Sequence, residues 1–520
     1  MPTYPVGIQV DLTATDKVPG QYIGTVFGVR GFPGPQDEYL LLIGEKAISG
    51  GTLTVDTQIA EVTSQADIAT LTGNEGNVLA RMANMALRAA PGIKLKLCAP
   101  TIPSGTAATA TITVDGTWTV ASGGPINIRV GNFPIDFSVG ASDTPDTWTA
   151  ALAAYINTLP QCPVTAAAAA GAGTTYIVTL TSKSYGPLGN NLIVWADSTY
   201  KPSGMTIVLG GGSAVASGGR RFTNGAGTIN LTTLVDTTLD PERSFTIACS
   251  ITDATNLGRL ETAVDRKAGV LVRKFEHVVV ASTGTQAAAT SLAQTTLDDV
   301  RFQMVWSEEQ ETPAEEMAAW WAAYRHIREA SHPNQYYSGV TVPFRYQEAA
   351  SKRPTRATLK AALDAGLSPI QYAGNNAFMT RAITTRSLTD AGAADDGTID
   401  VGHARTPDRV NEMLGLLWAT ITSPTDPAGY HYLRSSPAEG RESEVPAGVI
   451  HPNLWKQIVT RRLMEFESLK WITNVADNPP TVAMHPTAST PRFVFYCPLV
   501  PYPFPHQVEG TVAQQVFVPS

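Results

Sequence analysis

The chain has 520 residues, more than one hydrophobic core usually holds, so two to four domains are expected. Its formal net charge of −8 argues against nucleic acid as the main partner. No apolar run approaches the roughly 20 residues that a membrane helix needs, so no membrane insertion is expected.

The amino-acid composition and the first ten residues indicate which classes of protein the chain can belong to. Charged residues make up only 16%, and Thr, Ser, Ala and Gly take their place. Such a composition suits surfaces that other subunits cover, because a buried charge costs desolvation. A merely Thr-rich soluble protein would share it. The first ten residues, MPTYPVGIQV, show no pattern of a secretory signal, so none is expected.

Both ends of the chain alternate like β-strands. Side chains of a strand point to opposite faces with period two. One apolar face near the start carries Val6, Ile8, Val10 and Leu12, and one near the end carries Val508, Val512, Val516 and Val518. A proline-rich stretch, 498–505, precedes the second segment and predicts a stiff, extended spacer. Two lone strands on such spacers are predicted to pair with something outside their own neighbourhood.

The first interior segment predicts α/β structure. YLLLIGEK is a short apolar run typical of a buried strand, and IKLKLCAP predicts a second one. Between them, residues 64–90 have the apolar spacing of a helix that Pro91-Gly92 ends.

Residues 101–219 predict an inserted β-rich domain. Short Thr- and Val-rich strands recur there, and INIRV turns at Gly131-Asn132 into FPIDFSV, a hairpin signal. One helix is predicted over 145–159. The Ala- and Gly-rich runs 166–173 and 210–219 are interpreted as flexible joints.

The α/β rhythm returns after Phe245. Strands SFTIACSI, HVVVAS and FQMVWS alternate with helices predicted at 254–267, 286–297 and 313–329. This alternation predicts a mainly parallel sheet with helices on both faces. A short helix at 358–365, a hairpin turning at 374–376 and helices at 406–420 and 453–472 are predicted to follow.

The predicted fold class is therefore α/β, with a mainly parallel sheet built from N- and C-terminal parts, an inserted β-rich domain and extended terminal strand arms. The predicted divisions are 1–24 as the N-terminal strand arm, 25–100 as the first part of the α/β core, 101–222 as the inserted domain, 223–385 as the rest of the core, 386–497 as a C-terminal domain with a long amphipathic helix, and 498–520 as a tether and C-terminal strand arm.

The common catalytic motifs are missing from the sequence. There is no GxSxG, no GxxxxGK[ST] and no strand–GxGxxG–helix unit. The glycines of GVRGFPGP at 28–35 are interpreted as a turn, and the basic run 351–360 as a helix start or partner contact. Cys98, Cys162, Cys249 and Cys497 lie far apart, which predicts buried free thiols. No catalytic activity, metal or cofactor is expected.

Two groups of residues could form a binding site, but a structural role is the better prediction for each. His326 and His332 flank Glu329, yet a six-residue gap at a helix end suits a metal poorly, so a solvated end is expected. The pair Trp320-Trp321 could stack on bases or sugars. In an amphipathic helix, one Trp in the core and one at the rim is the better prediction.

Several stretches in a fixed order resemble a known family. They are KVPGQYIGTV, YLLLIGEKAISGGTLTVDT, the helical segment ending in APGIKLKL, VTLTSKSYGPLGNNLIVW, and SFTIACSITDATNLGRLETAV. Together they resemble the tail sheath proteins of contractile bacteriophages, in the Mu-type branch. The likeness covers most of the chain, but residues 386–452 match no part of the pattern.

The resemblance implies a mechanical role. Such sheaths form a helical homo-oligomer of stacked rings around the tail tube, and contraction drives the tube through the host envelope. Their N- and C-terminal arms add as strands to small sheets on neighbouring subunits. The implied partners are further copies, the tail tube protein, and baseplate and tail terminator proteins. The implied location is the virion tail, assembled in the host cytoplasm.

In this family a C-terminal helix contacts the tube. The resemblance makes the helix 453–472 the candidate, with Lys456, Arg461 and Arg462 as tube-contact residues. A core helix of the protein's own fold is an equally open interpretation.

Other classes stay as alternatives. An α/β hydrolase-like enzyme would need a nucleophile, a base and an orienting acid, and the sequence offers no such set. A β-rich surface adhesin would need an export signal. A tail tube subunit would be a much smaller chain.

Overall fold

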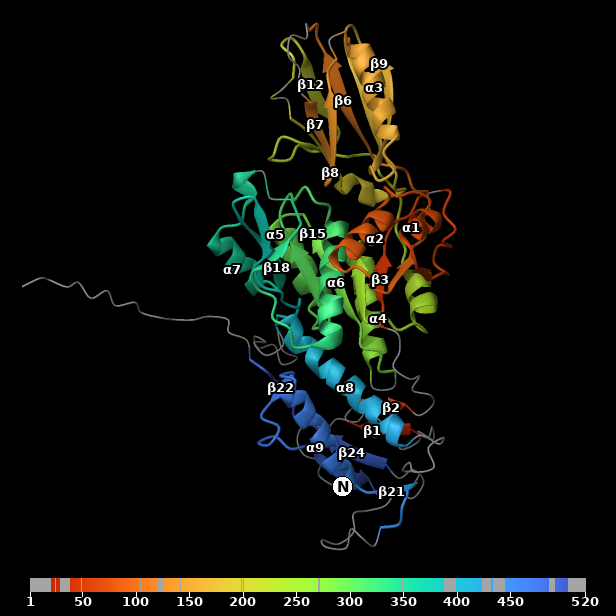
Figure 1. The fold of residues 1–520 in the computed structure, drawn as a ribbon, viewed down its shortest axis with the longest axis vertical. Helices are drawn as coiled ribbons and strands as arrows, with labels where there is room; N and C mark the ends of the chain where they lie inside the picture. The colour runs from red at the N-terminus through yellow and green to blue at the C-terminus, as the bar shows by residue number, and fades with distance from the viewer. Residues whose placement is uncertain are drawn as a thin grey trace, which may run out of the picture.

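The computed structural model describes residues 20–23, 25–28, 38–47, 49–102, 104–118, 125–140, 142–197, 199, 201–269, 272–345, 347, 349–387, 399–422, 432–433, 445–485 and 492–503. The predicted arm strands, with Val6, Ile8, Val10, Leu12, Val508, Val512, Val516 and Val518, lie outside these residues. The described part is elongated, and Figure 1 shows three groups of elements along its long axis.

A nine-stranded sheet forms the middle group. Its order is β17 (Val340–Val342), β19 (Asn376–Met379), β18 (Leu367–Ala373), β16 (Phe302–Trp306), β15 (His277–Ser282), β14 (Thr246–Cys249), β3 (Leu40–Ile43), β5 (Leu95–Cys98) and β4 (Ala60–Val62). The strands from β18 to β5 pair in parallel, and the edge strands pair antiparallel. β3, β14 and β16 are fully buried, as their unbroken apolar runs predict. The prediction of an α/β fold with a mainly parallel sheet is confirmed.

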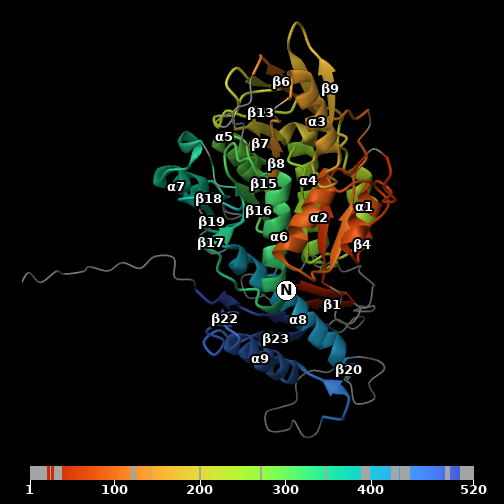
Figure 2. The same cartoon turned by 45° about the horizontal axis from the view of Figure 1, so that its top comes forward.

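Helices cover this sheet. They are α1 (Gln65–Thr72), α2 (Val78–Ala89), α4 (Ala254–Ala268), α5 (Gln286–Ser291), α6 (Ala314–Ser331) and α7 (Arg356–Asp364). α2 packs along α6 (Figure 2). α6 also contacts β3, β14 and β15 of the sheet. The connection from β3 to β5 runs one way along the sheet, and those from β14 to β15 to β16 run the other way. Right-handed crossovers therefore place α2 and α4 on opposite faces.

The single helix predicted over 64–90 is wrong, because the chain forms two. Gly73 ends α1 in a left-handed conformation with φ of +96°, which favours glycine. Asn77 then caps α2, and its side chain accepts a hydrogen bond from the Ala80 amide. Residues 73–77 read GNEGN and hold no apolar side chain, so the glycine and asparagine signals of a break were present in the sequence.

Residues 109–221 form two four-stranded sheets and one helix. The first sheet has the order β12 (Thr206–Gly210), β6 (Thr109–Asp115), β10 (Tyr176–Ser182), β9 (Val164–Ala170), and the second the order β13 (Arg220–Arg221), β11 (Ile193–Ala196), β7 (Pro125–Val130), β8 (Phe133–Ser138). α3 (Pro145–Asn157) packs on β9 and β10. These elements enclose a hydrophobic cluster of their own, centred on Trp148 and Ile128. The hairpin predicted at Gly131-Asn132 is confirmed.

The two predicted flexible joints are wrong. Ala166 to Ala170 belong to β9 and pair with β10 in register. Gly210 ends β12, and the Gly212 amide then donates to the Arg221 carbonyl at 2.8 Å. Composition suggested flexibility, but an antiparallel neighbour supplies the hydrogen bonds that hold even an alanine run extended.

The third group holds two long helices and four short ribbons. α8 (Val401–Ile421) and α9 (Pro452–Ser468) enclose a cluster in which the Trp418 and Trp455 rings meet at 85°, with centroids 4.6 Å apart. α8 starts at Val401, five residues before the predicted 406, and Pro407 lies inside it. The ribbons are β1 (Gly20–Ile23) with β2 (Thr25–Gly28), β20 (Tyr432–Leu433) with β21 (Val449–Ile450), β22 (Ile472–Thr473) with β25 (Val500–Pro501), and β23 (Thr481–His485) with β24 (Arg492–Tyr496).

A search of the described helices finds none with the length and apolar character needed to cross a membrane.

Candidate functional site

The carboxyl ends of the neighbouring strands β3 and β14 form the edge of the sheet where a ligand site is expected. Connections from these neighbouring strands leave in opposite directions, which makes them the topological switch point of the sheet. Open α/β sheets bind ligands in the crevice at this point. Gly44 and Glu45 follow β3 there, and Ser250 follows β14.

The chain's own 184–188 turn fills this crevice. The Leu188 amide donates to Glu45 Oε1 at 3.1 Å, and the Val78 amide, at the start of α2, donates to Ser184 Oγ at 2.8 Å. A side chain on Gly186 would place its Cβ 2.4 Å from Glu45 Oε1. The N-terminus of α2 could otherwise bind an anion. The turn therefore occupies both the crevice and the helix end that an enzyme of this fold would offer to a cofactor.

Glu45 is an unusual acid in this contact. Its side chain is fully buried, and Oε2 has no hydrogen-bond partner among the described residues. Burial raises the pKa of Glu45 to about 8, although the hydrogen bond from Leu188 acts in the opposite direction. The carboxyl group is therefore mostly protonated at neutral pH, which suits an anchor for the turn.

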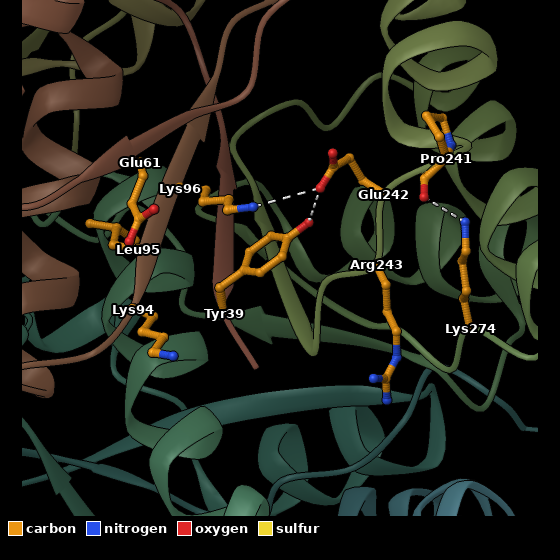
Figure 3. Close-up of a pocket in the computed structure, with 9 residues that line it drawn as sticks. All are labelled: Tyr39, Glu61, Lys94, Leu95, Lys96, Pro241, Glu242, Arg243 and Lys274. Atoms are coloured by element: carbon orange, nitrogen blue, oxygen red, sulfur yellow. Dashed lines mark hydrogen bonds and ion pairs between the residues drawn. The ribbon is translucent and has the colours of Figure 1, made fainter. Parts of the chain in front are cut away.

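The opposite, amino end of the sheet holds an open pocket of about 300 Å³, which we call the amino-end pocket. Figure 3 shows its lining, drawn from the starts of β3 and β5, from β4 and from the loops before β14 and β15. The lining residues are Tyr39, Glu61, Lys94, Leu95, Lys96, Pro241, Glu242, Arg243 and Lys274.

One wall of the amino-end pocket is a fixed polar group. The Tyr39 hydroxyl donates to Glu242 Oε2 at 2.8 Å, and Lys96 Nζ lies 3.7 Å from the same oxygen. The ammonium group also lies 4.0 Å from the centroid of the Tyr39 ring (Figure 3). Burial, followed by the contact with Glu242, raises the pKa of Tyr39, so its hydroxyl remains a donor.

The other wall joins the sheet to the third group of elements. Lys274 Nζ donates to the carbonyls of Asp240 and Pro241 at 2.8 and 2.7 Å. Arg243 forms an ion pair with Glu412 of α8. The lining holds four basic side chains (Lys94, Lys96, Arg243 and Lys274) and two acidic ones (Glu61 and Glu242), an excess of two positive charges. Glu412 beside Arg243 offsets one of these charges, so the surroundings of the pocket are closer to neutral than its lining.

The predicted tube-contact residues all lie on α9. Lys456 is exposed, and the Arg461 side chain is 87% exposed with Nε 4.0 Å from Glu465 Oε1. Arg462 pairs with Glu465, and its guanidinium lies 4.9 Å from the centroid of the Phe466 ring. The other face of α9 is buried in the third cluster through Trp455, Val459, Leu463 and Phe466. The helix thus has a core face and an outer face that carries these three basic residues together with Glu465, and contact with a tube stays a prediction.

The expectation of a solvated end around His326 is wrong. His326 is buried and meets the edge of Phe245, with ring centroids 5.2 Å apart, and burial lowers its pKa to about 3. Glu329 is also buried and binds Arg325 at 2.7 Å. The C-terminal half of α6 packs against Phe245 and against Arg405 and Arg409 of α8, all far away in the sequence, so the local sequence does not reveal its burial.

The prediction for the Trp pair is half right. Trp321 is in the core, but Trp320 is 7% exposed and therefore also buried. Tyr324 stacks on both indole rings, and Phe344 packs edge-on against Trp320. Neither ring is presented for stacking on a base or a sugar.

A buried ionic cluster was missed by the sequence interpretation. Asp408 of α8 accepts hydrogen bonds from Arg301 Nε and Nη2, both at 3.0 Å, and lies 3.1 Å from His277 Nε2. Arg405, one helical turn earlier, donates to the Phe245 and Phe275 carbonyls. A run of charges at helical spacing usually marks a solvated face. One signal in the sequence could have indicated their burial. Arg405 and Asp408 lie on the same helix as the apolar residues Val410 and Leu414, which are buried.

Within the part of the chain that the structure describes, one group of acidic side chains could bind a metal. Glu261, Asp265 and Asp299 have carboxylate oxygens within 4.8 Å of one another. Arg301 already lies 3.3 Å from Asp265, and its amide donates to Asp299. We interpret this group as an ion-pair cluster. Three cysteines, Cys98, Cys162 and Cys249, are buried, Cys497 is half-buried, and all four are free thiols.

No protein-family profile and no curated protein matches the chain. Among solved structures, the chain is similar to a sheath tail protein from Desulfitobacterium hafniense, with 16% identity, 91% of this chain and 99% of that chain covered, and a TM-score of 0.45. A sheath tail protein from Listeria innocua has 12% identity, covers 90% and 96%, and has a TM-score of 0.43.

A chain of the anti-feeding prophage baseplate has 9% identity, covers 99% of this chain and 100% of that chain, and has a TM-score of 0.44. The first two structures carry the name of the class that the sequence resemblance indicates.

Proposed function

We propose that this chain is the structural subunit of a contractile tail sheath, which polymerises helically around a tail tube and contracts to drive the tube through an envelope. Its partners are further copies of itself, the tube protein, and baseplate and terminator proteins. Its location is the virion tail after assembly in the host cytoplasm. The sequence resemblance supplies this class, and the ribbons of the third group support it physically.

The open ribbons are the observation that carries the proposal. Among the described residues, β22–β25 and β23–β24 hydrogen-bond as two-stranded sheets, while β1 lies beside β24 and α9 packs on β22 and β23. An isolated two-stranded ribbon is marginally stable, and its unpaired amides and carbonyls are a template for another strand. The sequence also predicts two strands, around Val6 to Leu12 and Val508 to Val518, that need such a partner. Strand addition between copies satisfies both requirements at once.

The filled switch point supports a structural role over an enzymatic one. Residues 184–188 occupy the place where an α/β enzyme would bind its ligand, and they also anchor the sheets of residues 109–221 to the main sheet. We infer that residues 101–222 form an inserted domain at the periphery of the assembly. Their separate cluster and their place at one end of the molecule support this (Figure 1).

In this proposal, contraction is driven by a small gain in free energy at each subunit. A head-to-tail strand contact that repeats builds an open helix. If each subunit gains only a few kcal/mol when it rotates and buries more surface, the sum over the array drives the movement. Main-chain pairing keeps the copies linked while they rotate.

Negative-stain electron microscopy of the purified chain tests the proposal. The expected result is hollow tubes with regular cross-striations, alone or around a co-expressed tube protein. A chain that stays monomeric at high concentration, with and without the tube protein, contradicts it.

A further inference from the structure

We propose that three arginines at the amino end of the main sheet, Arg243, Arg273 and Arg301, are positioning residues for assembly. They fix α8 on the sheet and thereby set the orientation of the third group of elements, which carries the ribbons that other copies extend. This inference rests on the proposed function, because it names the residues that hold those ribbons in place. It is independent of which strand is added to them.

The three arginines, which we call the arginine row, precede three neighbouring strands. Arg243 comes before β14, Arg273 before β15 and Arg301 before β16. These strands pair in parallel, so their amino ends meet at one edge of the sheet, about 4.8 Å apart from strand to strand. The arginine row therefore follows this edge, and Figure 1 shows α8 below it.

Each arginine of the row binds α8. The contacts, in strand order from β16 to β14, are Arg301 Nε and Nη2 to the Asp408 carboxylate at 3.0 Å, Arg273 Nη2 to the Asn411 carbonyl at 2.8 Å, and Arg243 to Glu412. On the next strand the signs are reversed, because Glu38 before β3 binds Arg409 at 2.6 Å. The partners rise along α8 in the order of the strands, so α8 lies across their ends.

The contacts of the row are polar and buried, which favours a role in positioning. Arg273, Asp408, Arg409 and Glu412 are each at most 7% exposed. Hydrogen bonds and ion pairs are directional, so they define one register of α8 on the sheet. From Val410 onward, the buried apolar side chains of α8 pack in the third cluster. The arginine row is therefore placed to decide how that cluster sits on the main sheet.

The backbone of Arg273 supports a specific role for its side chain. Its φ is +56°, in the left-handed region that residues with a side chain rarely adopt. Glycine would adopt this conformation with less strain. Burial, followed by the neighbouring Arg243, also lowers the pKa of Arg273 to about 9. An arginine that carries both costs points to a need for the contact that it makes with α8.

α8 links the arginine row to the ribbons. The Trp418 ring of α8 meets the Trp455 ring of α9, with centroids 4.6 Å apart. α9 in turn packs on β22 and β23, one strand from each of two ribbons, and α8 contacts β25. A shift of α8 along the row would therefore move both ribbons relative to the main sheet.

Two variants weaken the row without leaving a buried charge unpaired. Arg273→Gly deletes one side chain at a backbone conformation that glycine prefers. Arg301→Met with Asp408→Asn neutralises both partners of one ion pair. Arg273→Lys keeps a donor for the Asn411 carbonyl and is the rescue variant. Arg266→Ala, at a 52% exposed side chain of α4, is the control.

Distances between two spin labels measure the orientation of the third group. Thr262→Cys on α4 and Gln457→Cys on α9 provide exposed attachment sites. The background is Cys497→Ser, because the other three thiols are buried. An excess of unlabelled chain restricts the measurement to pairs within one copy. We expect one narrow distance distribution for the unaltered arginine row and for Arg273→Lys, and a broader or shifted one for the two weakened variants.

The concentration needed for polymerisation is the second measurement. We expect it to rise on the order of tenfold in the two weakened variants, and to stay unchanged in Arg273→Lys and Arg266→Ala. Circular dichroism and the thermal transition show whether each variant folds.

The outcomes separate this inference from the proposed function. If the wild-type chain forms tubes while the weakened variants match Arg266→Ala in either measurement, the positioning role fails and the proposed function stands. Loss of the thermal transition in both weakened variants also overturns it, because the arginines would then hold the fold as a whole. A wild-type chain that forms no polymer contradicts both proposals.

Discussion

Single side chains at the switch point determine how residues 109–221 are attached to the main sheet. Glu45 is buried and accepts a hydrogen bond from the Leu188 amide. Its burial favours the neutral acid, so folding takes up a proton at neutral pH. Gly186 is needed because any side chain would collide with Glu45. The contact is therefore a buried hydrogen bond that is sensitive to the charge of Glu45.

Glu45 is predicted to make stability depend on pH. Its pKa rises from an ordinary 4.5 to about 8 in the fold, so its contribution is fully present below about 4.5 and is lost as the pH rises to about 8. The loss is on the order of a few kcal/mol. Glu45→Gln keeps the acceptor oxygen and removes the titration. The variant's thermal midpoint should therefore fall less than that of the wild type between pH 5 and 8.5.

The comparison between wild type and Glu45→Gln isolates this residue from other acids that titrate in the same range. Equal slopes of midpoint against pH in the two proteins would show that Glu45 is charged in the fold.

Arg81 is predicted to be essential for the packing of α2 on α6. Its guanidinium lies 2.7 Å from carboxylate oxygens of both Glu315 and Glu316, and all three side chains are buried. Arg81→Met leaves two buried carboxylates without their counter-ion, so we expect a loss of about 3–5 kcal/mol in the free energy of unfolding.

Denaturant unfolding measures the loss at Arg81. Lys360→Met on α7, where the side chain is 76% exposed, is the control, and it should change stability by less than about 0.5 kcal/mol. Similar values for the two variants would refute a structural role for the Arg81 pair.

At the scale of elements, α9 combines two roles on two faces. Its buried face closes the third cluster, while Arg461 and Arg462 lie on the outer side. We predict that Arg461→Glu with Arg462→Glu impairs assembly on the tube protein and leaves self-polymerisation intact. Arg356→Glu with Lys360→Glu, on the exposed surface of α7, is the matched double reversal.

Co-sedimentation with preformed tubes and turbidity of the sheath protein alone give the two measurements for α9. An equal loss of both would refute tube contact by these arginines, because it would indicate a general defect of folding or self-assembly.

Element prediction from the sequence succeeded where one local pattern decides the structure. The apolar runs at Leu40–Ile43, Thr246–Cys249 and Phe302–Trp306 are buried strands, as predicted. It failed where distant partners decide. Ala166–Ala170 is a strand because β10 lies beside it, and His326 is buried because Phe245 covers it. The buried charges of α8 were missed because their partners, such as Arg301 and His277, are far away in the sequence.

At the scale of the whole molecule, the described residues form three hydrophobic clusters: in the main sheet, in residues 109–221, and around α8 and α9. Polar contacts join them. α8 connects two of them, since Arg405 and Asp408 face the main sheet while Leu414 and Trp418 pack against α9. α8 therefore contacts both the main sheet and the cluster around α9. Neither the amino-end pocket nor this connection could be predicted from local patterns, because each is assembled from segments more than a hundred residues apart.

The strand-addition account depends most directly on the two chain ends. Removing residues 1–19 and 504–520 should leave the described clusters folded, with an unchanged main thermal transition. Analytical ultracentrifugation of full-length and trimmed chains at equal concentration is the measurement. The account predicts that the full chain sediments as large polymers and the trimmed chain as a monomer. A trimmed chain that polymerises as readily as the full one would contradict it.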